Sequence, residues 1–190
     1  MAALTDGVIA IAITLLVLDI AVPDIPDALV GDELGSALWE LRPELFGFLL
    51  SFVLIAYYWA SHRLLFSHLR TIDGQLITIN LFFLLMIALM PFAAALLAEY
   101  APDDLAVACY AAIMAVAGIA QLAMLVYPTA KGHFHADVNR SHVSLIVRKV
   151  AVAPVVYLAA VPVAFVDGWA ALAMFVLIPA GRYLVHRRDG

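Results

Sequence analysis

Six apolar runs alternate with short polar segments along the chain. Each run has about the 20 residues that a helix needs to cross a hydrocarbon core of ~30 Å. The runs are too long and too evenly apolar for the alternating ~10-residue strands of a membrane barrel. The pattern therefore predicts an all-α, polytopic membrane protein, a single six-helix transmembrane domain over residues 1–190, with spans at 4–22, 41–66, 76–98, 104–127, 143–165 and 169–185. A loop is predicted at 23–40 and another at 128–142.

Composition agrees with this pattern and excludes several classes of protein. Apolar residues make up 66% of the chain and charged residues 13%, against about half and a quarter in ordinary soluble domains. Mean hydropathy is +1.03, which excludes a cytosolic enzyme. The single cysteine, Cys109, excludes a disulfide framework and a cysteine zinc site. No phosphate-binding loop, dinucleotide fingerprint or nucleophile elbow occurs, so we expect no catalytic residue and no cofactor. Nucleic-acid binding has no support because basic residues are not in surplus.

Charged residues sort by loop. Nine of the ten Lys and Arg follow even-numbered spans, and only Arg42 lies on the other side. Eleven of the fifteen carboxylates lie on the side of Arg42. Since basic residues favour the cytoplasmic side, we expect a multi-pass protein of the cell (plasma) membrane with both termini in the cytoplasm. The acidic loops either attract cations to the outer face or are simply solvated.

The first apolar run is bracketed by two carboxylates, Asp6 and Asp19, with twelve uncharged residues between them. At 1.5 Å per residue the two are about 20 Å apart along a helix, which is shorter than the membrane core. Either one carboxylate lies at membrane depth, facing protein or water, or a thinned or tilted helix places both at the interface.

Two stripes run along this first helix. Val8, Ile11, Leu15 and Leu18 form an aliphatic stripe by their spacing. Beside it lies a strip of small residues, Gly7, Ala10 and Thr14, which allows helices to approach closely. The aliphatic stripe is either a packing or lipid-facing surface or a hydrophobic constriction of a pore.

The first three runs resemble the bacterial members of the transmembrane protein 175 family, which are potassium channels. Residues 5–19 read Thr-Asp-Gly-Val-Ile-Ala-Ile-Ala-Ile-Thr-Leu-Leu-Val-Leu-Asp, close to the first helix of that family. Residues 58–62 (Tyr-Trp-Ala-Ser-His) and 80–85 (Asn-Leu-Phe-Phe-Leu-Leu), followed by Pro91-Phe92, match its second and third helices. The Arg that opens the family signature has no counterpart here, and its Phe-Ser reads Leu4-Thr5. The last three runs agree only in hydropathy and spacing.

The resemblance implies a potassium-permeable channel, a homotetramer in the lipid bilayer whose first helix lines a central pore. Its constriction corresponds to Ile11, Leu15 and Leu18, with Thr14 beside it. The sequence lacks the Thr-Val-Gly-Tyr-Gly filter of ordinary potassium channels. The Thr14 hydroxyl either contributes to the pore or bonds back to the carbonyl of Ala10.

The resemblance also implies a polar network that ties three helices together. It comprises Thr5 and Asp6 of the first helix, Trp59 and His62 of the second and Asn80 of the third. We expect an Asp–His–Asn set to satisfy its own hydrogen bonds, because polar groups within spans need partners.

Two other functions remain as alternatives. A small secondary transporter would have a binding site near the midplane, but no inverted repeat or mid-span ionisable residue is present. A membrane enzyme would use a metal at His133, His135, Asp137 and His142, whose spacing fits no zinc signature. We therefore expect solvated histidines and no metal.

Overall fold

The computed structural model describes residues 2–135, 140–175 and 178. This part of the chain is helical and contains no strand, only an isolated bridge between Leu69 and Phe134. The elements in order are α1 (Ala2–Leu15), η1 (Leu16–Asp19), η2 (Asp27–Leu29), α2 (Val30–Glu40), α3 (Arg42–Ser67), α4 (Gly74–Ala88), α5 (Met90–Tyr100), α6 (Asp104–Lys131) and α7 (Arg140–Ala164). Residues 168–175 form a further helical segment.

Among the described residues, four helical segments are long and apolar enough to cross a membrane: Arg42–Ser67, Gly74–Tyr100, Asp104–Lys131 and Ile146–Ala164. They correspond to the second to fifth predicted spans, and they confirm an all-helical, multi-pass membrane protein. The first predicted span, 4–22, is shorter than expected, because α1 has 14 residues before it tightens into the four-residue 3-10 turn η1. The sixth, 169–185, begins in the 168–175 segment and continues outside the described residues.

The predicted loop at 23–40 is wrong in part, because it contains η2 and the 11-residue helix α2. Val30, Leu34 and Leu38 recur every four residues and share one helix face. Asp32 and Glu33 lie in the first turn of α2, where negative charge favours a helix N-terminus. An 11-residue amphipathic helix is too short to produce the long apolar run by which the spans were identified.

The third predicted span is interrupted at Leu89, where α4 ends and α5 begins. Pro91 lies in the first turn of α5. A proline lacks the N–H for the helical ladder and disfavours helical geometry in the residue before it. Pro128 lies inside α6 rather than in the predicted 128–142 loop, because α6 continues to Lys131 and ends at Gly132 with a φ of 70°. Glycine adopts this left-handed conformation without strain.

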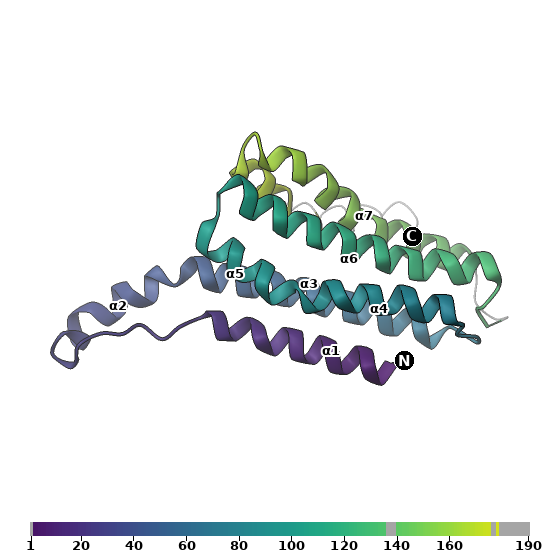
Figure 1. Cartoon of the computed structure of the whole chain (residues 1–190), viewed down its shortest axis with the longest axis horizontal. Helices are drawn as coiled ribbons and strands as arrows, with labels where there is room; N and C mark the ends of the chain where they lie inside the picture. The colour runs from purple at the N-terminus through teal and green to yellow at the C-terminus, as the bar shows by residue number, and fades with distance from the viewer. Residues whose placement is uncertain (1, 136–139, 176–177, 179–190) are drawn as a thin grey trace.

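The helices form three layers (Figure 1). α1 packs on α3 and α4, α6 packs on α4 and α5 from the opposite side, and α7 packs on α6. The middle layer supplies large buried side chains such as Leu76, Phe83 and Ile87. The core of the bundle therefore lies between the layers, and α1 covers only one outer side of it.

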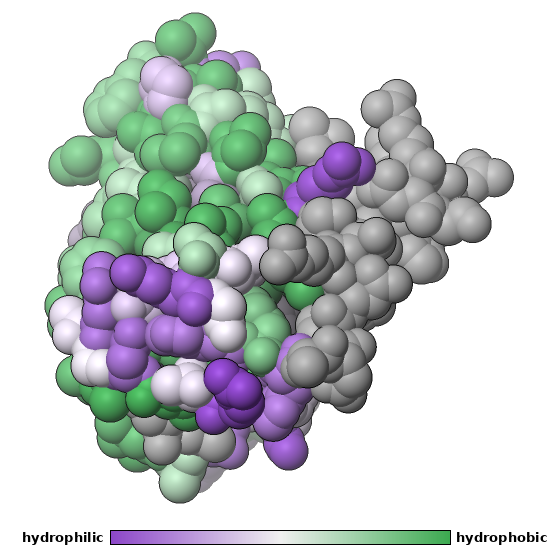
Figure 2. Space-filling view, turned by 90° about the vertical axis from the view of Figure 1, so that its right-hand side faces the viewer, coloured by the Kyte–Doolittle hydropathy of each residue, from purple (hydrophilic) through white to green (hydrophobic). Residues whose placement is uncertain are grey.

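The two ends of the bundle differ in charge. α1 begins at the end where α3 ends, and there Arg70 N–H donates to the carbonyl of His133 at 2.8 Å, joining the α3–α4 and α6–α7 connections. Hydrophilic side chains gather on this end, and hydrophobic ones cover the flanks (Figure 2). α2 and the acidic turn around Asp103 lie at the opposite end. We call the end where α1 begins the basic end, and the end with α2 the acidic end.

Candidate functional site

α1 has a buried face and an outward face. Thr5, Ile9, Ala12 and Leu16 are buried against the middle layer. By contrast, Ile11 is 61% exposed, Leu15 43% and Leu18 73%. Within the described part of the chain, the three residues predicted to form a constriction are thus exposed, Ile11 and Leu15 on α1 and Leu18 on η1.

The outward face differs slightly from the stripe seen in the sequence. Val8 is half-buried and packs against the core, so the exposed stripe has three members rather than four. Val17 is also 50% exposed. It lies in η1, where successive residues are about 120° apart, so it is rotated by about 120° from Leu18 and lies off the stripe. The small-residue strip is also open, since a Cβ placed on Gly7 would meet nothing within 4 Å outside its own helix and chain neighbours.

The Thr14 hydroxyl lies within hydrogen-bond distance of two carbonyls of its own helix, Ala10 O at 3.0 Å and Ile11 O at 2.9 Å. Of the two roles considered for this side chain, the structure contains the bond back to the helix. Its single proton is therefore directed to the backbone, and only its oxygen lone pairs face outward.

Asn80 of α4 joins α1 to α3. Its Nδ2 donates to Thr5 Oγ1 at 3.2 Å, and its Oδ1 lies 2.8 Å from Nε2 of His62. Because the amide oxygen only accepts, His62 Nε2 carries the hydrogen in this pair. All three side chains are buried, and the His62 ring stacks on Phe66 with 4.2 Å between centroids. These hydrogen bonds join α1, α3 and α4 at one depth in the bundle.

A separate contact joins Asp6 to Trp59, whose Nε1 donates to Asp6 Oδ1 at 2.7 Å. The Arg63 guanidinium lies 5.2 Å from the centroid of the Trp59 ring. The expected Asp–His–Asn set is thus wrong in its pairing, since Asp6 binds Trp59 and Asn80 binds both Thr5 and His62. The reason is geometric: Asp6 follows Thr5, so its side chain is rotated by about 100° around the helix.

Sequence reasoning missed a polar cluster at the basic end. Tyr127 of α6 donates to Oδ2 of Asp73, the N-cap of α4, and His133 Nε2 lies 3.9 Å from the same oxygen. The Tyr127 hydrogen bond, followed by the bond from Leu76 N–H, lowers the pKa of Asp73. An Asp directly before a Gly that starts an apolar run is a helix-capping signal, but nothing local to the sequence indicates Tyr127 as its partner.

The metal alternative gains no support from the described residues, among which no three metal-binding side chains gather. His133 faces Asp73. Asp137 and the side chain of His142 lie outside what the structure describes.

Comparisons with known proteins place these features in context. Residues 1–91 match a family model described as the endosomal/lysosomal potassium channel TMEM175. A potassium channel of Chamaesiphon minutus is 35% identical over 182 residues, which is 92% of this chain and 88% of that protein. A potassium channel of Streptomyces collinus is 37% identical over 137 residues, 69% of this chain and 64% of that protein. The crystal structure of a lysosomal potassium-selective channel TMEM175 homolog from Chamaesiphon minutus superposes with a TM-score of 0.81 at 31% identity, covering 97% of this chain and 95% of that one.

Proposed function

The chain belongs to the TMEM175 family, and from this premise we propose that it is a potassium-permeable cation channel whose first helix lines the pore. The relatives that share most of its length are named potassium channels. These names favour a channel over the transporter and over the membrane enzyme, and they agree with the family expected from residues 5–19.

The observation that carries the proposal is the uncovered aliphatic stripe on α1. One helix cannot enclose a path, so several copies must surround a common axis. Around such an axis Ile11, Leu15 and Leu18 stack as successive aliphatic rings. A narrow apolar ring opposes the passage of ions by excluding water. Gly7 and Ala10, which are also exposed, let neighbouring copies of α1 approach closely.

We propose a homotetramer with six spans in each subunit and both termini in the cytoplasm. The positive-inside tendency supports this orientation, because Arg63, Arg70 and Lys131 gather at the basic end where α1 begins. In this orientation the acidic end faces outward, where its carboxylates attract cations. Without a carbonyl filter in the sequence, selectivity depends on the aliphatic rings and on partial hydration of the ion.

Potassium flux into liposomes tests the constriction. Ile11→Ala and Leu15→Ala shorten residues that are 61% and 43% exposed in the subunit, so they remove less buried surface than a core substitution and should leave the protein folded. We expect both to raise flux per folded tetramer and to weaken discrimination against sodium, because a wider ring is easier to wet. Val17→Ala is the matched control: Val17 is an exposed aliphatic residue of η1, the turn that continues α1, and it lies off the stripe. This change should leave both properties unchanged.

Light scattering in mild detergent gives the amount of tetramer by which the flux is divided, and it tests the number of subunits. We expect about four times 20.5 kDa of protein. Equal or lower flux in both stripe variants, with the tetramer intact, would place the pore on a different face. A flux-competent monomer or dimer would refute the tetramer.

A further inference from the structure

A cleft of about 620 Å³ opens at the acidic end of the bundle, away from the pore helix. It lies where the start of α3, the end of α5 and the 168–175 segment meet, and its apolar lining includes Phe46, Leu97 and Leu172. Its volume falls in the range of about 300–1,000 Å³ that is typical of ligand pockets. Glu40 and Arg42 lie on its polar side.

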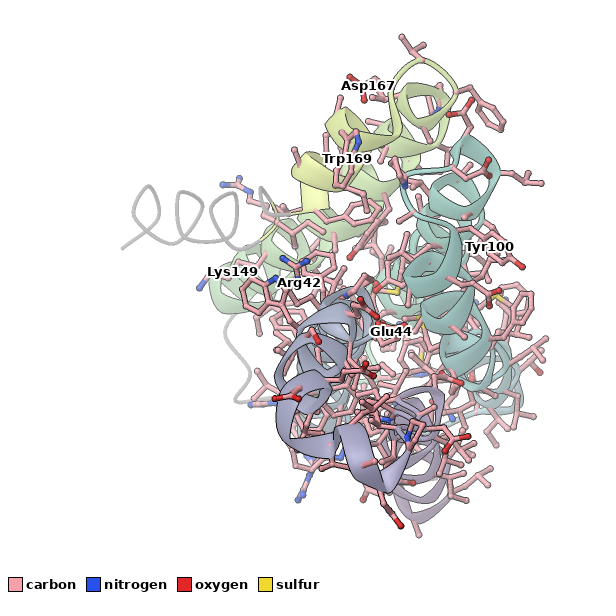
Figure 3. The ribbon with its side chains drawn as sticks, turned by 90° about the vertical axis from the view of Figure 1, so that its left-hand side faces the viewer. Arg42, Glu44, Tyr100, Lys149, Asp167 and Trp169 are labelled. Atoms are coloured by element: carbon pink, nitrogen blue, oxygen red, sulfur yellow. The ribbon has the colours of Figure 1, made fainter. Side chains whose placement is uncertain are left out.

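Two tryptophans place this cleft at the level of the lipid headgroups. Trp39 is 64% exposed and Trp169, which lines the cleft, is 67% exposed. Tryptophan is enriched where the hydrocarbon core meets water. Arg42 is the first residue of the membrane-spanning helix α3, and Phe46 lies one turn deeper. Figure 3 looks onto this end, with Arg42 on α3 and Trp169 on the 168–175 segment.

Among the described residues, Arg42 is a cation without a carboxylate partner. Its Nε donates to the carbonyl of Trp39 at 2.6 Å, and its guanidinium lies 4.0 Å from the centroid of the Trp39 ring. These contacts fix the group but do not neutralise it, and no carboxylate of the described residues lies within ion-pair distance. A guanidinium presents a planar fork of donors that suits a phosphate. Glu40 contributes a negative charge to the same cleft.

We propose that this cleft binds a phospholipid with an ethanolamine headgroup. An acyl chain fills the apolar lining between α3, α5 and the 168–175 segment, the phosphate binds Arg42, and the ammonium group lies by Glu40. A zwitterionic headgroup complements a rim that carries one positive and one negative charge, whereas the glycerol headgroup of phosphatidylglycerol offers no cation to Glu40. The site lies in each subunit and does not depend on ion conduction.

Native mass spectrometry of the purified full chain tests the proposal. The protein is delipidated and titrated with phosphatidylethanolamine or phosphatidylglycerol of identical acyl chains. We expect tighter retention of phosphatidylethanolamine, and about tenfold weaker retention in Arg42→Gln, because a hydrogen-bonded charge is lost. The matched control is Arg70→Gln, which removes an exposed Arg at the basic end and should change nothing.

A second pair of variants tests the acyl chain. Ala173→Phe adds an aromatic ring from an exposed position that lines the cleft, and should reduce retention of both lipids. Ala170→Phe adds the same ring at an exposed position of the same segment outside the lining, and should not. Equal retention in all four variants overturns the proposal. So does a change of oligomeric state in Ala173→Phe with lipid retention unaltered, because a second copy then occupies the cleft.

Discussion

Replacing Asn80 by Leu removes the hydrogen bonds that join α1, α4 and α3 while keeping the branched shape and the number of side-chain heavy atoms. His62 and Thr5 both lose a partner at buried positions. Hydrogen bonds between membrane helices contribute about 0.6 kcal/mol on average and up to about 1.7 kcal/mol. Two such bonds give an expected loss of about 1–3 kcal/mol. The Thr5 hydroxyl can turn to a carbonyl of its own helix, so most of the loss comes from His62.

The assay is reversible unfolding of the purified protein in mixed micelles, followed by circular dichroism. Thr78→Val is the control, since Thr78 is exposed on the same helix and its hydroxyl donates to Gly74 O of its own helix. We expect a change within about 0.5 kcal/mol for it. Combining Asn80→Leu with Thr5→Val should cost less than the sum of the single changes, because the two side chains bond each other. Additive losses, or an Asn80→Leu loss no larger than that of Thr78→Val, would refute this account of how α1 is held.

Two further predictions concern other contacts. Gly118→Val should lower the free energy of unfolding by about 1–3 kcal/mol, because a Cβ there lies 3.0 Å from Pro154 Cδ. The control is Gly35→Val, where a Cβ meets nothing within 4 Å. Equal effects of the two changes in urea unfolding would contradict this packing. The Tyr127 hydroxyl lowers the pKa of Asp73 below the ordinary 3.8. The Asp73 carboxylate therefore stabilises the fold at pH values above 3.8, and this stabilisation is lost as the pH falls through the lowered pKa of the folded protein. Asp73→Asn should therefore lower the melting temperature at pH 7 and lower it less at pH 3. A difference independent of pH would exclude this role.

Long apolar runs identified the second to fifth spans, because a run of about 20 apolar residues is typical of a membrane-spanning helix and of few other structures. α2 was missed because its apolar residues occupy only one face of 11 residues. The members of the polar network follow from the family resemblance, but their pairing does not. Whether Asp6 reaches His62 or Trp59 depends on the rotation of α1 relative to α3, a property of packing. The cleft likewise has no local signal, since Phe46, Leu97 and Leu172 are far apart in the chain.

The hydrogen bonds that fix α1 to its neighbours lie at Thr5 and Asp6, near its beginning. Further along, the helix is held by apolar contacts of Ile9, Ala12 and Leu16, which have no preferred direction. α1 thus resembles a lever with its fulcrum at the basic end. From Thr5 to Leu18 the arm is about 20 Å long, so a tilt of about 5° at the fulcrum moves the Leu18 ring by about 1.7 Å while the Asn80 contacts stay nearly in place. In such a lever, the ring farthest from the hydrogen bonds changes its diameter most.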